Sequence, residues 1–370
     1  MFIQRNILLN PGPGTTSDEV KKAMVVPDIC PREDEFCKVM ESIKLDLPKV
    51  VNGGEDYTSV LFTASGTGGV EAAITSAIPR DGKLLVIENG AYGTRMCRIA
   101  EYYSIPYVSY KLAYGDFPDV HEVEKILKAD AGITHISVVH HETTTGMLNP
   151  VEDICKVGHA CGREIIVDTV SSYAGLSVDL NKWKAEYIVS SSNKCIQGMA
   201  GLSFVIFKKS LLDKLKGRGR SHYFDIYAQY NGFHSTGQMQ FTPPVQVVYA
   251  LRKALDLFFE ETAQGRIARY RENYETLYHG LKKMGFRFLL PEEYQSGILV
   301  AINEPLNSEY SFQGMHDYMY ERGFTIYPGK GAKEATFRLA VLGDLYKADI
   351  ESALVALKSY LESVNIKTIR

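Results

Sequence analysis

Three stretches of the chain carry side chains that could bind an anion or act as a nucleophile. The segment TASGTGGVEAAI (63–74) places Ser65, Gly66 and Thr67 directly before a predicted helix, where free backbone N–H groups and two hydroxyls can bind a phosphate. Asp168 follows the apolar run IIV, and Lys194 follows a second apolar run and lies among small residues. A lysine in a partly dry pocket has a lowered pKa and can serve as an amine nucleophile.

Each stretch could also have a purely structural role, without catalysis or ligand binding. The glycine-rich segment is compatible with a plain strand–helix turn, and it is neither a dinucleotide fingerprint nor a Walker loop. Asp168 could cap a helix or close a turn, and Lys194 could be an exposed turn lysine. Together the three are more informative, because a phosphate cup, a carboxylate and an amine match the phosphate, the pyridinium nitrogen and the aldehyde of pyridoxal phosphate.

A fourth stretch, VVHHETTTGMLNP (138–150), combines two histidines, a glutamate and three threonines. Adjacent residues of a strand point to opposite faces, so His140, His141 and Glu142 cannot all reach one metal ion. We therefore predict no metal site here and interpret the stretch as a hydroxyl-rich turn that lines a pocket. The segment PGKGAK (328–333) lacks the Ser or Thr of a nucleotide-binding loop and is interpreted as a loop near the substrate entrance.

Short apolar runs that alternate with amphipathic stretches predict an α/β fold. The runs are continuous, as expected for strands buried on both faces of a mostly parallel sheet. They are LLVIE (84–88), IPYVSY (105–110), ITHISVV (133–139), IIVD (165–168), YIVSSS (187–192) and GLSFVIF (201–207), with helices expected near 92–103, 119–129 and 151–162. In such sheets ligands bind beyond the carboxyl ends of the strands, which is where Asp168 and Lys194 are expected.

The length of 370 residues favours two lobes. From Val245 to Met284 the pattern is helical, with an interruption expected at Gly265, and the strands and helices that follow predict a smaller α+β lobe. We predict an N-terminal arm at 1–15, a large domain at 16–250 and a small C-terminal domain at 251–370.

Composition excludes several classes of protein. Hydrophobic residues make up 45% of the chain and charged residues 23%, which is typical of a globular protein and not of a disordered one. The net charge of -3 gives no general attraction to nucleic acid or to an anionic membrane. The six cysteines form no C-x-x-C pair, and the N-terminal apolar stretch is broken by Arg5 and Pro11, so we expect no zinc site, no secretory signal and a cytoplasmic location.

Longer motifs carry a resemblance to a known family. They are ILLNPGPGTTSDEVKKAM, DYTSVLFTASGTGGVEA, ENGAYGTRM, HHETTTGMLNP, IVDTVSS, SSNKCIQGMAG, DIYAQY, QFTPPVQ, FTIYPGKG and TFRLAVLGDLY, and they run from residue 7 to residue 346. The chain resembles the pyridoxal-phosphate aminotransferases of fold type I, class V. The resemblance implies pyridoxal 5'-phosphate as cofactor and a large lobe with a mostly parallel sheet.

The resemblance also implies roles for individual residues. Lys194 would bind the cofactor's aldehyde, Asp168 would pair with the pyridinium nitrogen, and Tyr92 would stack on the ring in place of the Trp of related enzymes. Thr143 would reach the ring's 3′-oxygen. The phosphate would be held by Ser65, Gly66 and Thr67.

Two further roles concern a partner subunit and the substrate. Thr242 would complete the phosphate site of a neighbouring subunit, which implies a homodimer, and Arg338 would receive the carboxylate of pyruvate or alanine. Gly68, where other members carry a bulkier residue, is expected to widen the pocket. For a phosphonate group, Arg32, Arg95 and Arg338 are candidates by charge, and the sequence does not rank the first two.

The branch of the family that the chain resembles most transfers the amino group of 2-aminoethylphosphonate to pyruvate, giving phosphonoacetaldehyde and L-alanine. The alternatives are an alanine–glyoxylate or serine–pyruvate aminotransferase, another pyridoxal-phosphate reaction such as a lyase or desulfurase, and a non-enzymatic binding protein. A desulfurase needs a mobile cysteine, and we expect Cys195 to be packed behind Lys194. An intact Lys194 and Asp168 argue against a mere binder.

Overall fold

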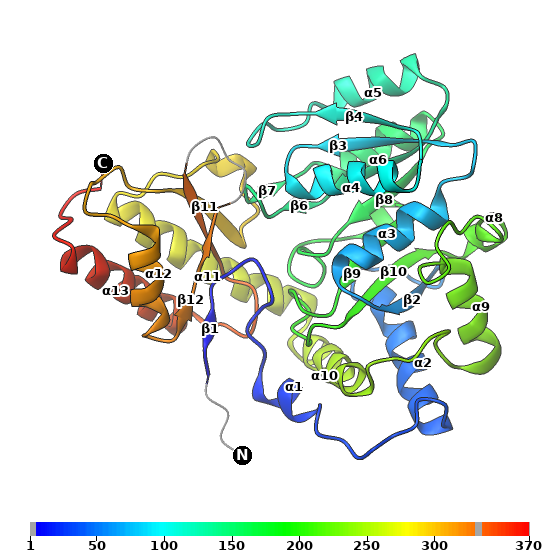
Figure 1. Ribbon diagram of the computed structural model, residues 1–370, viewed down its shortest axis with the longest axis horizontal. Coiled ribbons are helices and arrows are strands. Elements are labelled where there is room, and N and C mark those ends of the chain that lie inside the picture. The colour runs from blue at the N-terminus through cyan, green and yellow to red at the C-terminus, as the bar shows by residue number, and fades with distance from the viewer. Residues whose placement is uncertain (1–4, 330–334, 370) are drawn as a thin grey trace.

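The computed structural model describes residues 5–329 and 335–369, which form a large and a small lobe (Figure 1). A seven-stranded sheet lies at the centre of the large lobe. Its order is β2 (Tyr57–Thr63), β10 (Leu202–Lys208), β9 (Tyr187–Ser191), β8 (Glu164–Asp168), β5 (Ile133–Val139), β3 (Lys83–Glu88) and β4 (Tyr107–Lys111). Strand β10 runs antiparallel to the other six strands, which are parallel to one another. The predicted α/β class with a mostly parallel sheet is confirmed.

Helices cover both faces of this sheet, which explains the continuous apolar runs of the strands. One face packs on α2 (Asp34–Lys49), α5 (Val120–Ala129), α6 (Val151–Ala160) and α10 (Val245–Glu261). The other face packs on α3 (Gly66–Ala77), α4 (Ala91–Tyr102) and α9 (Ile226–Thr236). Short elements complete the lobe: β6 (His141–Glu142), β7 (Met147–Leu148), α7 (Leu180–Trp183), η1 (Lys209–Leu211) and α8 (Leu212–Leu215).

The small lobe has a hydrophobic core of its own. Its antiparallel sheet has the order β11 (Leu299–Asn303), β14 (Thr336–Ala340) and β13 (Tyr327–Pro328). The helices around it are α11 (Ala263–Met284), α12 (Phe312–Tyr320) and α13 (Lys347–Ser363), with the single turn η2 (Glu292–Tyr294) before β11. This arrangement agrees with the α+β character expected after the long helical region.

The break in that helical region is at Thr262, and the expectation of Gly265 was wrong. Thr262 has a φ of 68°, and its side chain accepts a hydrogen bond from the Gly265 backbone N–H at 3.1 Å, which caps α11. Gly265 therefore lies in the first turn of a helix rather than between two helices. The helical region is therefore interrupted at Thr262, whose hydroxyl caps the start of the second helix, and not at the glycine.

The start of the chain joins the two lobes. Strand β1 (Ile7–Leu8) pairs in parallel with β12 (Phe324–Thr325) of the small lobe, and Leu9 lies in the small lobe's core. Helix α1 (Asp18–Lys22) then packs on α10 of the large lobe through Val20. The domain limits at residues 15 and 250 stay a prediction.

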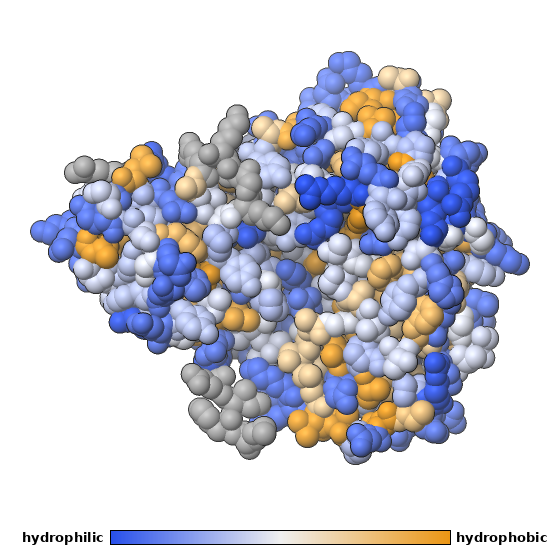
Figure 2. All heavy atoms as spheres, in the orientation of Figure 1, coloured by the Kyte–Doolittle hydropathy of each residue, from blue (hydrophilic) through white to orange (hydrophobic). Residues whose placement is uncertain are grey.

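On the face shown in Figure 2, apolar side chains gather in the part of the view where α1 and α10 lie in Figure 1. Val25, just beyond α1, is 82% exposed. Over the described ranges, no helix combines the length and the apolar character that a bilayer crossing requires.

Candidate active site

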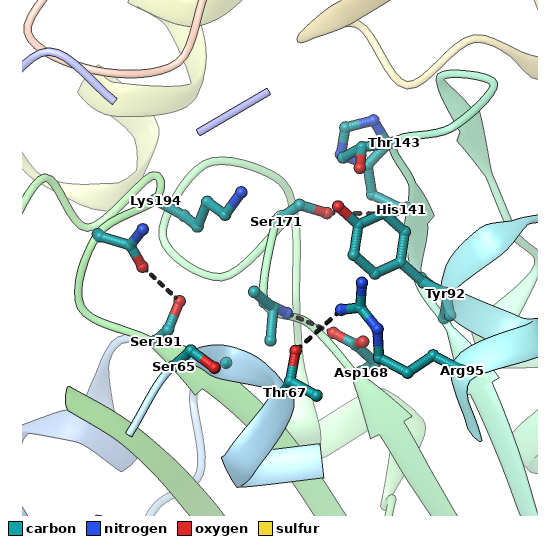
Figure 3. Close-up of a pocket in the computed structure, with 14 residues that line it drawn as sticks. Ser65, Thr67, Tyr92, Arg95, His141, Thr143, Asp168, Ser171, Ser191 and Lys194 are labelled. Atoms are coloured by element: carbon teal, nitrogen blue, oxygen red, sulfur yellow. Dashed lines mark hydrogen bonds between the residues drawn. The ribbon is translucent and has the colours of Figure 1, made fainter. Parts of the chain in front are cut away.

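A cavity of about 200 Å³ opens where the carboxyl ends of β5, β8 and β9 meet (Figure 3). Its wall contains the predicted cofactor residues except Thr242, together with several residues that the sequence did not single out. The lining residues are Ser65, Gly66, Thr67, Tyr92, Arg95, Val139, His141, Thr143, Asp168, Val170, Ser171, Ser191, Asn193 and Lys194.

Lys194 lies in the connection from β9 to β10, and its side chain points into the cavity (Figure 3). Its Nζ donates a hydrogen bond to the backbone carbonyl of Pro11, at 2.6 Å, so the N-terminal segment forms part of the site. Burial lowers the pKa of Lys194 to about 8. The structure therefore gives Lys194 the partly dry surroundings of a nucleophilic amine.

Asp168 is the last residue of β8 and is 5% exposed. Its Oδ1 accepts a hydrogen bond from the Val170 backbone N–H at 2.8 Å, as in a turn. Burial raises the pKa of Asp168 to about 6. In the described parts of the chain no cation forms an ion pair with this carboxylate, which leaves it free for a positively charged ligand.

The predicted phosphate cup lies at the start of α3. Ser65 is the N-cap residue, and its hydroxyl makes no capping hydrogen bond. The first N–H groups of a helix have no partner within the helix. Gly66 and Thr67, the first two residues of α3, line the cavity beside this hydroxyl. Thr67 Oγ1 accepts a hydrogen bond from Arg95 Nη1 at 2.9 Å.

Tyr92 and Arg95 lie on the first turn of α4. The Arg95 guanidinium lies over the Tyr92 ring, 4.7 Å from its centroid. Arg95 therefore connects the predicted ring-stacking residue to the phosphate cup.

Two buried polar side chains in the wall have no partner among the described residues. They are Thr143 through Oγ1 and His141 through both ring nitrogens, and the two side chains are 2% and 1% exposed. Burial lowers the pKa of His141 to about 3, so its ring is neutral. Buried polar atoms are normally hydrogen-bonded, so unpartnered ones in a cavity indicate a ligand.

Arg338 lies on β14 of the small lobe and is 7% exposed. Its guanidinium donates to the carbonyls of Pro328, at 3.1 Å, and Thr143, at 3.2 Å. No carboxylate of the described ranges pairs with it, and burial lowers its pKa. A buried cation that is held only by carbonyls is suited to bind an anionic ligand. The described residues provide no acidic side chain that would make Arg338 part of a structural salt bridge.

Residues 21–311 match the family described as aminotransferase class-V. The chain belongs to the class-V aminotransferase family.

Relatives that match over nearly the whole chain agree with this assignment, and a solved structure shares the fold. A 2-aminoethylphosphonate–pyruvate transaminase of Vibrio vulnificus (strain CMCP6) is 41% identical over 355 residues, 95% of this chain and 96% of that protein. One of Salmonella paratyphi B is 40% identical over 97% of this chain and 98% of that protein. The alanine–glyoxylate aminotransferase of Nostoc sp. superposes with a TM-score of 0.90 at 23% identity, covering 98% of this chain and 96% of that chain, which shows the fold.

Two expectations about this class-V aminotransferase are corrected by the structure. Gly68 does not widen the cavity, because a Cβ at this position would meet Ala64 and Phe224, which do not line the cavity. Arg32 does not reach the cavity of its own chain, since it donates to Gln238 at 2.7 Å and to the Met239 carbonyl at 3.2 Å.

Cys195 is fully buried in the core of the small lobe, and burial raises the pKa of its thiol to about 12. This confirms that it is packed away from the cavity and excludes it as a mobile nucleophile.

Three predicted features of the aminotransferase are absent from the lining of the observed cavity: Arg338, Thr242 and the entrance loop. Arg338 reaches the wall through its hydrogen bond to the Thr143 carbonyl. Thr242 is exposed and accepts a hydrogen bond from Thr63 through its backbone carbonyl at 3.2 Å, so its role at a partner's site stays a prediction. Residues 330–334 of the predicted entrance loop lie outside the described residues.

Several site residues were missed by the sequence analysis. Pro11, Ser171, Ser191 and Asn193 line or contact the site through backbone groups and short polar side chains. The PGPG turn and the small residues before Lys194 were visible in the sequence, but nothing in them indicated that they would meet.

Proposed function

We propose that this class-V aminotransferase binds pyridoxal 5′-phosphate in the cavity and transfers the amino group of 2-aminoethylphosphonate to pyruvate. The products would be phosphonoacetaldehyde and L-alanine. One observation carries the proposal: a single cavity joins the amine of Lys194, the carboxylate of Asp168 and the helix start at Ser65–Thr67. The names of the relatives at 40–41% identity support the choice of donor and acceptor.

The wall of the cavity fits this cofactor in charge and in hydrogen bonding. Asp168 offers an unpaired carboxylate to the pyridinium nitrogen, and Thr143 offers an unpartnered hydroxyl to the ring oxygen. The exposed Ser65 hydroxyl and the first turn of α3 offer donors to the phosphate. When bound, the cofactor supplies an aldehyde that captures the amino group and a ring that withdraws electrons.

Lys194 would act twice in this reaction. Its amine would hold the cofactor's aldehyde in the resting protein, and Nζ would then give up its hydrogen bond to the Pro11 carbonyl. With a substrate amine in its place, Lys194 Nζ would be free to move the proton at the carbon that bears the amino group. Its lowered pKa favours this role, because a larger fraction of the amine is neutral near neutral pH than for an ordinary lysine.

Arg338 would bind the carboxylate of pyruvate. Its planar fork can make two parallel hydrogen bonds to a carboxylate, which an ammonium group cannot. The present partners of its guanidinium are neutral carbonyls, so no acidic side chain of the described residues competes with the substrate.

Assembly and location are also part of the proposal. The exposed Thr242 and the apolar area near α1 and α10 in Figure 2 support a homodimer in which Thr242 reaches the partner's phosphate site. Domain limits at residues 15 and 250 and a cytoplasmic location remain proposals from the sequence.

A panel of half-reactions tests the donor. The purified protein is loaded with the cofactor and mixed with 2-aminoethylphosphonate, L-alanine or L-serine, and conversion of the cofactor to its amine form is followed by absorbance. We expect conversion with 2-aminoethylphosphonate and L-alanine, and recovery of the starting spectrum with pyruvate. Conversion with L-serine but not with 2-aminoethylphosphonate would replace the proposal by a serine–pyruvate aminotransferase, and recovery by glyoxylate alone would indicate an alanine–glyoxylate enzyme.

A further inference from the structure

Glu142, the second residue of β6, has a fully buried side chain that accepts four hydrogen bonds. Oε2 accepts from the backbone N–H groups of Tyr92, at 3.1 Å, and Gly93, at 3.3 Å. Oε1 accepts from the Thr144 backbone N–H at 3.1 Å and from the Thr144 hydroxyl. The carboxylate therefore joins its own strand to the first turn of α4.

All four of these partners are donors, and this determines which side chain fits. A carboxylate offers acceptors at both ends, whereas an amide offers acceptors at one end only. Burial raises the pKa of Glu142, and the hydrogen bonds from Thr144, Gly93 and Tyr92 act in the opposite direction. A carboxylate at the N-terminus of α4 is also favoured by the helix dipole.

Gly90 leaves the space that the Glu142 carboxylate occupies. Its φ of −177° is extended backbone that any residue can adopt, so conformation does not require glycine here. A Cβ at Gly90 would overlap the carboxylate carbon of Glu142. The missing side chain thus allows the close approach of Glu142 to α4.

Two residues next to Glu142 line the cavity, one on α4 and one beside Glu142 in the sequence. Tyr92, whose N–H it accepts, presents the proposed stacking face. Thr143, its neighbour in sequence, presents the unpartnered hydroxyl and accepts a hydrogen bond from Arg338 through its carbonyl. A shift of Glu142 would therefore move both cofactor-facing groups relative to each other.

We propose that Glu142 is a positioning residue whose carboxylate holds the ring of Tyr92 and the hydroxyl of Thr143 in one geometry around the cofactor. The inference rests on the function proposed above. Glu142 touches no reacting atom itself, since it does not line the cavity. It acts on cofactor binding through α4 and β6.

Glu142→Gln tests the inference, with Glu88→Gln as the matched control. Glu88 is also buried, at 7% exposure, and accepts a hydrogen bond from Thr94 Oγ1 of the same helix at 2.9 Å. Unlike that of Glu142, its side chain accepts no hydrogen bond from a described residue that lines the cavity. Glu142→Gln should weaken cofactor binding at least about tenfold, because a hydrogen bond to a charged group contributes about that factor. It should also change the circular dichroism of the bound cofactor, and Glu88→Gln should leave both unchanged.

Gly90→Ala provides a second route that leaves Glu142 in place. It should reproduce the weaker cofactor binding, and the double variant with Glu142→Gln should lose less than the sum of the two changes, as expected for groups in contact. Gly232→Ala is its control, because nothing lies within 4 Å of a Cβ built at Gly232. If Glu142→Gln does not fold, Gly90→Ala still tests the inference.

Cofactor affinity by equilibrium dialysis and thermal unfolding of the cofactor-free proteins separate the outcomes. If Glu142→Gln and Glu88→Gln lose affinity equally and in proportion to their loss of melting temperature, Glu142 is only structural and the inference is wrong. If the wild-type protein binds no pyridoxal phosphate, the proposed function itself fails. If cofactor binding is weaker in Glu142→Gln and Gly90→Ala but unchanged in Glu88→Gln and Gly232→Ala, the proposed positioning role of Glu142 is supported.

Discussion

Asp168→Asn should stabilise the cofactor-free protein and impair the loaded one. The Asp168 carboxylate is 5% exposed and accepts a hydrogen bond from Val170, and burial raises its pKa from an ordinary value of 3.8 to about 6. A difference of about two pKa units corresponds to about 3 kcal/mol between the two protonation states. The empty site therefore holds a carboxylate that destabilises it when ionised.

The direction of the pH dependence follows from this shift. Because the folded protein holds the Asp168 proton more tightly than the unfolded chain does, stability falls as pH rises from 3.8 to about 6. The loss of stability caused by the ionised Asp168 is complete above the pKa of the folded protein, about 6, and absent below the pKa of the unfolded chain, 3.8. At neutral pH, Asp168→Asn should therefore raise the free energy of unfolding of the cofactor-free protein by up to about 3 kcal/mol.

In the loaded protein the effect has the opposite sign. A neutral amide cannot keep the pyridinium nitrogen protonated, so Asp168→Asn should bind the cofactor less tightly and lose turnover by orders of magnitude. Urea unfolding of the cofactor-free proteins at acidic and neutral pH measures the first effect, and cofactor titration with turnover measures the second. Asp213→Asn, at an exposed position, is the control and should change neither.

Two results would refute this reasoning. A cofactor-free Asp168→Asn protein that is no more stable than wild type at neutral pH would show that the carboxylate does not destabilise the empty site. Near-normal turnover in the variant would contradict the pairing of Asp168 with the pyridinium nitrogen.

Three further predictions concern other residues of the site. Borohydride reduction of the loaded protein should fix the cofactor on Lys194, and reductive labelling of another lysine would contradict the assignment. In the cofactor-free protein, acylation of Lys194 should accelerate as pH rises through about 8. Arg338→Lys should lower kcat/KM for pyruvate by a factor that corresponds to a loss of about 2–5 kcal/mol in transition-state stabilisation, with the cofactor absorbance unchanged. Unchanged kinetics would make Arg338 structural. The active protein should sediment as a dimer and Thr242→Ala should weaken cofactor binding, a proposal that a fully active monomer would overturn.

The fold and the main site residues were predictable because their signals are local. Continuous apolar runs indicated strands buried on both faces, and Asp168 and Lys194 stand at or just beyond strand ends that the runs themselves define. The capping hydroxyl of Thr262 was overlooked in favour of Gly265, because glycine is the more familiar interruption of a helical pattern. The outcome for Gly68 could not be read from the sequence, since a helix face has no direction until its neighbours are known.

Contacts between distant segments were decided only by the tertiary structure. Strand order brings the ends of β8 and β9 together, so that Asp168 and Lys194 share a cavity. Pro11 meets Lys194 because β1 pairs with β12 of the small lobe. Glu142 stood in a motif of hydroxyl residues, and its four hydrogen bonds depend on β6 lying against α4.

The sequence by itself determined the types of chemical group and the secondary-structure ends at which they stand, because residue pattern and backbone preference act over a few neighbouring positions. The tertiary structure alone decided which polar groups are buried without a partner, as the Thr143 hydroxyl is, and which are held by neutral carbonyls, as the Arg338 guanidinium is. It also decided that Arg32 is bound to Gln238 instead. Burial and pairing depend on what packs against a side chain from elsewhere in the chain. The shifted pKa values of Asp168 and Lys194 follow from that packing and from no local feature of the sequence.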